Sequence, residues 1–269
     1  MRMVRAVFSH GSGRIGGAIV GFYLLVAVLG MVGLTPHDPL AQFRIDRLHA
    51  PSAAYWMGTD LFGRDVASRL MVGVGQSFIV AFLSVAFASL AGTVLGLAAA
   101  WLGRRWDGIV MRVMDVLLAF PAILLALLIV AVAGPGTWTS VVAIGIVYTP
   151  IFTRIVRGPA LSLKAREFVD AARTFGSSTR YIVTRHLLLN LVAPLTVQVT
   201  LALAWALLTE AGLSFLGLGT QPPAASLGLM LSDSRKLMET APWLMIFPGL
   251  AIMISILGFN LLGDALRDI

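Results

Sequence analysis

The sequence predicts an all-α, polytopic membrane protein with six transmembrane helices. Of its 269 residues, 58% are hydrophobic and only 12% are charged, and several uncharged runs are long enough to cross a membrane. Soluble domains usually carry about 25% charged residues, so these few charges cannot cover a water-soluble globule of this length. The composition therefore argues against an ordinary soluble enzyme or a disordered chain. The absence of Cys excludes a disulfide framework and a thiol nucleophile.

The first two spans are predicted over residues 15–36 and 70–103, both of which are uncharged. A spanning helix needs about 20 mostly apolar residues. The first run follows the basic residues Arg2, Arg5 and Arg14, but it is longer than the roughly 7–15 apolar residues of a signal peptide. It also lacks an obvious small-x-small cleavage site, so we expect a retained anchor.

The remaining four spans follow from two longer stretches. The uncharged run 116–153 is too long for one helix and is interrupted by Gly-Pro-Gly at 134–136. This triplet predicts a tight turn, so we expect two helices joined by a short hairpin. A fifth span is predicted to begin near residue 187 and to continue past Glu210, and a sixth covers 241–263.

The positions of the basic residues predict the orientation. With the N-terminus in the cytoplasm, 14 of the 20 basic residues fall in cytoplasmic segments. These are Arg2, Arg5, Arg14, Arg104, Arg105, Arg112, Arg154, Arg157, Lys164, Arg166, Arg173, Arg180, Arg185 and Arg267. This asymmetry is typical of inner-membrane proteins. Topology therefore explains the net charge of +7, and no nucleic-acid partner is needed to explain it.

The predicted cytoplasmic segment 154–190 is unusual because it has helical periodicity. Phe168, Ala171, Ala172 and Phe175 recur at i, i+3, i+4 and i+7, which predicts an apolar face on a short helix. Such a face could lie on lipid headgroups, pack on the protein's own helices, or dock a partner. Periodicity alone leaves these alternatives open.

Charged and capping residues complete the prediction for this segment. Arg166 and Asp170 are one turn apart on another face, where they can form an ion pair. Gly176 is expected to end the helix, and Ser177 and Ser178 supply hydroxyls that can cap a second helix. The result is a short amphipathic helix, a sharp turn and another helix.

The stretch 170–190, DAARTFGSSTRYIVTRHLLLN, resembles the cytoplasmic loop signature of ABC importer permeases. That signature is an acidic residue, two alanines, three further residues and a glycine, matched here by Asp170, Ala171, Ala172 and Gly176.

Two positions depart from the pattern. Asp170 stands where Glu is usual. Leu189 stands where the peptide-permease version usually has Pro before Asn190, so we expect the second helix to continue without a kink.

Three further stretches resemble the C-type permease subunit of the dipeptide/oligopeptide/nickel group. They are YWMGTDLFGRDVASRLMVGVGQSF (55–78), EAGLSFLGLGTQPPAASLGLML (210–231) and FPGLAIMISILGFNLLGDALRD (247–268), with Leu227 where a Trp is usual. The resemblance therefore covers roughly residues 55–269.

The first of these stretches reads as the start of a helix. Thr59 or Asp60 can cap it, and Asp60–Arg64 and Asp65–Arg69 have the i, i+4 spacing of ion pairs. We interpret it as an exposed, salt-bridged helix start, not a substrate contact.

The resemblance implies a type I ABC importer permease (MetI-like) fold. Residues 1–74 would form an N-terminal anchor helix and an extracytoplasmic segment. Residues 75–269 would form the permease transmembrane domain, with a cytoplasmic coupling loop at about 158–190. In the family this loop docks on the ATPase. The implied docking residues here are Phe168, Asp170, Ala171, Ala172, Arg173 and Gly176.

The implied function is that of a permease subunit that forms half of a translocation pathway for peptides in the bacterial inner membrane, with both termini in the cytoplasm. Its partners would be a second homologous permease, two ATPase subunits, an extracytoplasmic solute-binding protein and membrane lipid. Nickel, glutathione or another small solute is an alternative cargo for the same class of importer.

The chain itself carries no sign of catalysis. Neither Lys164 nor Lys236 follows a G-x-x-x-x-G-K loop, and no H-E-x-x-H or G-x-S-x-G pattern occurs. We therefore expect no enzyme activity, cofactor or metal, with ATP hydrolysis in separate subunits.

A rival reading from another class is a secondary transporter or channel that works without ATPases, which would be expected to place ionisable residues at mid-membrane. Glu210, Asp115 and Asp264 instead fall near predicted span ends. Water and headgroups can relieve much of the charge penalty there, and we expect structural roles for all three.

Overall fold

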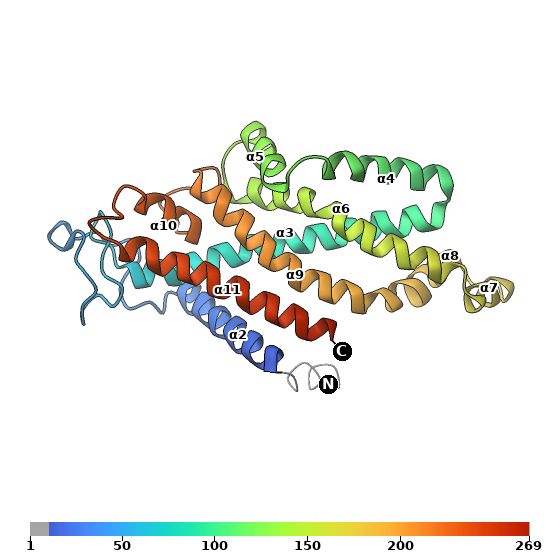
Figure 1. Ribbon diagram of the computed structural model, residues 1–269, viewed down its shortest axis with the longest axis horizontal. Helices are drawn as coiled ribbons and strands as arrows, with labels where there is room; N and C mark the ends of the chain where they lie inside the picture. The colour runs from blue at the N-terminus through green and yellow to red at the C-terminus, as the bar shows by residue number, and fades with distance from the viewer. Residues whose placement is uncertain (1–10, 269) are drawn as a thin grey trace.

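The computed structural model describes residues 11–268, which form a bundle of helices (Figure 1). The α-helices are α2 (Gly11–Val32), α3 (Val66–Leu102), α4 (Arg104–Leu118), α5 (Ala122–Ala133), α6 (Thr137–Lys164), α7 (Glu167–Thr174), α8 (Thr179–Tyr181), α9 (Leu188–Phe215), α10 (Leu227–Ser234) and α11 (Trp243–Arg267). Within the described range, β pairing is limited to one isolated bridge between Thr59 and Asp65. The predicted all-α class is confirmed. The basic residues Arg2 and Arg5 lie outside the described residues.

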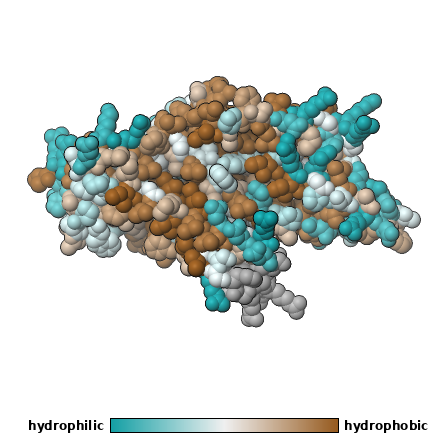
Figure 2. Space-filling view, in the orientation of Figure 1, coloured by the Kyte–Doolittle hydropathy of each residue, from teal (hydrophilic) through white to brown (hydrophobic). Residues whose placement is uncertain are grey.

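Five helices in the described part are long and apolar enough to cross a membrane: α2, α3, α6, the continuous helix 179–215 and α11. The pair α4 and α5 would bring the number to six if it counts as one span, but its two helices meet at a 92° bend. Figure 2 shows the matching surface, with apolar residues gathered across the middle of this face and hydrophilic residues at both ends. The chain is therefore a multi-pass membrane protein.

The structure of the predicted third span differs from the prediction, because it is not one straight helix that begins at residue 116. Residues up to Leu118 belong to α4, and α5 begins only after Pro121. Proline restricts the residue before it and has no N–H to donate, so the helix breaks here. The predicted turn at 134–136 is confirmed, because Gly134 ends α5 with a φ of +94° and α6 begins at Thr137.

The core of the bundle is the packing of α3 against α6, which run side by side for much of their length (Figure 1). Gly92 allows this approach, because a Cβ atom placed there would lie 2.4 Å from the Phe152 Cβ and 2.9 Å from the Thr149 carbonyl oxygen. Small residues let membrane helices approach closely. Helices α9 and α2 pack against α3, and α11 packs against both α9 and α2.

The start of α3 corrects two sequence predictions. Its N-cap is Asp65, whose carboxylate accepts hydrogen bonds from the Ser68 N–H (3.0 Å) and hydroxyl (2.6 Å), whereas Thr59 and Asp60 lie in the preceding loop. The Asp60–Arg64 pair is confirmed at 2.6 Å. The predicted Asp65–Arg69 pair is wrong.

Arg69 approaches Asp60 instead, at 3.7 Å. The helix start is also buried and not exposed, since Arg64, Asp65 and Arg69 are all buried. The loop before α3 covers it, and the His37 N–H donates to the Ser68 hydroxyl at 2.9 Å.

Glu210 is also more deeply enclosed than its place near a span end predicts. It is 1% exposed, and the Ser214 hydroxyl donates to one carboxylate oxygen at 2.7 Å. Among the described residues, the other oxygen has no hydrogen-bond partner, although the hydroxyls of Ser77 and Ser226 lie close to the same carboxyl group. Protein groups therefore enclose this carboxyl where α3, α9 and the segment leading into α10 meet.

We predict that Gly92→Ala destabilises the bundle by about 1–3 kcal/mol, the usual cost of overpacking a close contact. Gly108→Ala is the matched control, because a Cβ atom at Gly108 meets no atom of the described residues within 4 Å. That change should be neutral or stabilising by up to about 1 kcal/mol, since Ala favours helix. Thermal unfolding of the detergent-solubilised protein measures both. Equal midpoints for the two variants would contradict the role of Gly92.

Candidate docking site on helix α7

Helix α7 lies at one end of the molecule, beyond the ends of α3 and α6 (Figure 1). It ends at a left-handed residue, because Gly176 has a φ of +76°. The Ser177 N–H donates to the Ala172 carbonyl (3.0 Å) and the Gly176 N–H to the Arg173 carbonyl (2.9 Å), the two bonds of a Schellman motif. Ser178 then caps α8 through its hydroxyl. The predicted helix, turn and second helix are confirmed.

Val169 anchors α7 to the bundle. Its side chain is 0% exposed and belongs to a small buried cluster that is separate from the main core. The cluster combines residues from the end of α3, the end of α6 and the start of the helix 179–215: Leu97, Ala100, Val156, Ala160, Val169, Ile182, Leu187 and Leu191. Helix α7 is therefore packed against three membrane-spanning helices at once.

The buried face of α7 is centred on Val169, which does not belong to the predicted apolar face. Ala172 packs against the Val169 cluster, but Phe168 (41%), Ala171 and Phe175 (88%) are exposed. Val169, Ala172, Arg173 and Gly176 share the same i, i+3, i+4, i+7 spacing, so spacing alone could not choose between the two faces. The structure turns the phenylalanines outward, where both remain exposed to solvent.

Cations and an aromatic ring fix the orientation of α7. Arg173 lies over the Trp101 ring, with its guanidinium carbon 5.1 Å from the centroid, and Lys164 lies 5.3 Å from the same centroid. Lys164 Nζ also donates to the Ala100 and Trp101 carbonyls at the end of α3, both at 2.9 Å. Cation–π contacts of this kind contribute about 0.5–1 kcal/mol where exposed. Trp101 therefore joins α7 to the ends of α3 and α6.

The ion pair on α7 also differs from the prediction. Asp170 pairs with Arg173 at 3.3 Å, and Arg166 is instead the N-cap residue, whose extended backbone precedes the helix. Both partners of the observed pair are largely exposed, so it adds little stability. Asp170 in the first turn and Arg173 in the last turn do match the helix dipole.

An aromatic group continues the exposed face onto the next helix. The Phe168 and His186 rings are 5.8 Å apart, and the Tyr181 and His186 rings are 5.6 Å apart. Residues 182–187 form a π-helical turn inside one continuous helix that runs to Phe215. The expectation that this helix continues past Leu189 is confirmed.

Taken together, the sequence-predicted site residues fall into two groups. Phe168, Asp170 and Ala171 face solvent, with Phe175 beside them. Ala172, Arg173 and Gly176 hold the helix in place. The arrangement offers an apolar surface with one ion pair, which is suited to binding a protein groove and not to bond-making chemistry.

A family model described as the binding-protein-dependent transport system inner membrane component matches residues 92–269. The chain belongs to this family. The matched part of this permease includes α7, the Val169 cluster and most of the spanning helices, while α2 and the covering loop before α3 precede it.

Curated relatives match nearly the whole permease. It is 44% identical, over 94% of its length and 83% of the relative, to the dipeptide transport system permease protein of Alkalihalophilus pseudofirmus. It is 40% identical to a probable D,D-dipeptide transport system permease protein of Escherichia coli, over 94% of this chain and 85% of the relative. It is 44% identical to a glutathione transport system permease protein of Pectobacterium atrosepticum, over 87% of this chain and 78% of the relative.

Solved structures support the fold. A chain of the MetNI methionine ABC transporter, described in inward-facing conformations, aligns with a TM-score of 0.61 at 20% identity, over 74% of this permease and 95% of that chain. A chain of an amino acid ABC transporter aligns with a TM-score of 0.56 at 17% identity, over 74% of this permease and 94% of that chain. The predicted importer permease fold is confirmed.

Sequence reasoning missed Val169, Trp101 and Lys164. A signal for Val169 was present, because it begins a second set of positions with helical spacing that ends at Gly176. Trp101 and Lys164 are separated from α7 in the sequence and meet it only because α3 and α6 pack in parallel, with their last turns at the same end of the bundle. No local pattern indicates that contact.

We predict that Val169→Asp releases α7, because an unpaired charge in the buried cluster costs about 3 kcal/mol or more. Proteolysis within residues 165–178 should become much faster, while the main thermal transition changes less. The matched control is Phe175→Asp on the exposed face of the same helix end, which should leave the cleavage rate unchanged. Equal protection in both variants would show that Val169 does not anchor α7.

Proposed function

We propose that this importer permease carries short peptides and that α7 is the helix on which an ATPase subunit docks. The observation that carries the docking proposal is the outward face of α7, where Phe168, Ala171 and Phe175 are exposed beyond the ends of the spanning helices. Exposed aromatic side chains of this kind act as anchors in protein interfaces.

The proposed orientation places the α7 end and both termini in the cytoplasm. Basic side chains at that end support it, including Arg104, Arg105, Arg154, Arg157 and Lys164 around the ends of α3, α4 and α6. An excess of Lys and Arg is characteristic of cytoplasmic segments. The α10 end would then face outward, where an extracytoplasmic binding protein delivers the substrate.

In the assembled importer we propose two permease chains and two ATPase subunits, with this chain lining half of the pathway. ATP-driven movement of the ATPases would displace α7. Because Val169 packs on the ends of α3 and α6 and on the start of helix 179–215, that displacement would be transmitted to the spanning helices. Packed interfaces of this kind switch between discrete arrangements and do not deform continuously.

The names of the relatives support peptides as the cargo, since dipeptide and di/tripeptide permeases match over nearly the whole chain. The glutathione permeases among the relatives favour a second candidate, glutathione. An importer of this class driven by separate ATPases accounts for an exposed docking helix, whereas a secondary transporter has no use for one.

We predict that Phe175→Asp weakens ATPase binding roughly thirtyfold, the factor that corresponds to the loss of an interface anchor worth about 2 kcal/mol. ATP-driven peptide uptake should fall with it. Ile45→Asp is the matched control, because Ile45 is the more exposed side chain (97%) and lies in the loop at the opposite end. Co-purification of the ATPase and uptake into proteoliposomes provide the measurements. Normal coupling in Phe175→Asp would contradict the docking role.

We predict further that Gly176→Val uncouples transport, because a β-branched residue is strained at a φ of +76°. Gly176→Asn should keep most of the activity, since Asn tolerates this conformation. In the described part of the chain, no neighbouring atom lies within 4 Å of a Cβ placed at this position, so steric crowding does not explain a difference between the variants. ATP-dependent uptake at equal protein levels tests the pair, and equal uptake would show that the turn geometry is unimportant.

A further inference from the structure

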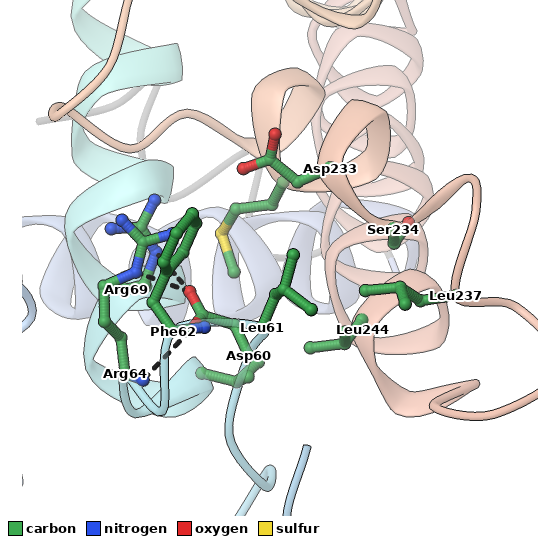
Figure 3. Close-up of a pocket in the computed structure, with 11 residues that line it drawn as sticks. Asp60, Leu61, Phe62, Arg64, Arg69, Asp233, Ser234, Leu237 and Leu244 are labelled. Atoms are coloured by element: carbon green, nitrogen blue, oxygen red, sulfur yellow. Dashed lines mark hydrogen bonds and ion pairs between the residues drawn. The ribbon is translucent and has the colours of Figure 1, made fainter. Parts of the chain in front are cut away.

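At the end of the molecule opposite α7, a cavity of about 190 Å³ lies between the start of α3, the end of α10 and the start of α11. Its charged lining is Asp60, Arg64, Arg69 and Asp233, and its apolar lining includes Leu61, Leu237 and Leu244. Figure 3 shows Arg64, Arg69 and Phe62 on one side of the cavity, and Leu237 and Leu244 on the other. The cavity is smaller than the roughly 300–1,000 Å³ of sites for drug-sized ligands.

The two arginines have more hydrogen-bonding capacity than their protein partners use. Arg64 Nε lies 2.6 Å from Asp60 Oδ2, and Arg69 Nε lies 3.7 Å from the same oxygen. Arg69 is 4% exposed, and its other oxygen contact is a long one, 3.5 Å to the Pro39 carbonyl. Among residues 11–268, the terminal nitrogens of Arg64 have no acceptor. Two buried guanidinium groups thus share one carboxylate, which leaves donors in a fork geometry that suits a second carboxylate.

Asp233 provides a negative group at the same cavity. It forms no ion pair within the described part of the chain, yet it interacts electrostatically with both arginines. Burial raises the pKa of the Asp233 carboxyl, and the two arginines partly offset this effect. With Asp233 included, the formal charges of the lining balance, so the cavity is suited to a ligand that carries both signs.

We propose that this cavity binds a short zwitterionic peptide, with its carboxylate at Arg64 and Arg69, its ammonium group at Asp233, and its side chains on Leu237 and Leu244. The choice of a peptide, and not another zwitterion, rests on the proposed function. The cavity would be a holding site at the outer end of the pathway, reached before the peptide enters the helix bundle. An acidic side chain from a protein partner is the competing occupant.

The absence of Cys from the chain allows a direct test. Leu237→Cys places one thiol on the cavity wall, and Met238→Cys places one on the next residue, which is exposed and does not line the cavity. The importer is assembled in nanodiscs without ATP or binding protein, and maleimide labelling is measured against L-alanyl-L-alanine. The dipeptide should slow labelling of Leu237→Cys and leave that of Met238→Cys unchanged. Its C-terminal amide and its N-acetyl derivative, which each lack one charge, should protect poorly.

A second variant keeps the test independent of folding. Asp233 makes no ion pair within the described residues, and asparagine has nearly the same size and shape, so Asp233→Asn combined with Leu237→Cys should fold normally. It should need roughly tenfold more dipeptide for half-protection, which corresponds to about 1.4 kcal/mol. Ser232→Ala, one residue away and outside the lining, is the matched control and should leave half-protection unchanged.

Several outcomes would overturn the inference: labelling that ignores the dipeptide, equal protection by the two blocked derivatives, or protection only by added binding protein. ATP-driven uptake is measured separately. If the dipeptide protects the thiol but is not taken up, the cavity assignment stands and the proposed function fails. If the dipeptide is taken up normally but does not protect the thiol, the proposed function stands and the cavity assignment fails.

Discussion

The close packing of α3 against α6 is the constraint on which the other parts of this permease depend. Gly92 lets the two helices meet at backbone distance, and both helices then project to each end of the bundle. At one end their last turns hold Val169 and, through Trp101 and Lys164, the position of α7. At the other end, the start of α3 supports the loop that contains Asp60 and forms one wall of the charged cavity. The two candidate functional surfaces thus share one rigid pair of helices.

This arrangement explains how a small helix at one end of the bundle can be coupled mechanically to the spanning helices. Helix α7 has only two turns and would not be stable alone, so its position is set by the buried cluster beneath it. Because that cluster joins α3, α6 and helix 179–215, α7 cannot move without moving at least one of them. The exposed phenylalanines add nothing to this anchoring, which leaves them available to a partner. The anchoring face and the proposed docking face therefore lie on opposite sides of the same helix.

Much of this organisation could be predicted from the sequence, because membrane helices are recognised by their long apolar runs and turns are marked by Gly and Pro. Gly176, Ser178 and the Gly-Pro-Gly turn were all predicted in their correct roles. The failures concern which face or partner a residue meets. Val169 and Phe168 lie on two faces of α7 whose residues have the same spacing. Only the packing of α7 on α3 and α6 determines which of the two faces is buried. Likewise, Arg69 approaches Asp60 and not the Asp65 one turn away, whose Oδ2 atom caps the helix.

Site-directed cross-linking tests the docking of an ATPase on α7 most directly. A photoactivatable maleimide attached to Phe175→Cys, in the otherwise Cys-free chain, is irradiated in the assembled importer, with Ile45→Cys at the opposite end as the comparison. The account predicts a covalent adduct between the permease and an ATPase subunit from Phe175→Cys alone. Adducts with lipid only, or an ATPase adduct from Ile45→Cys and none from Phe175→Cys, would contradict it.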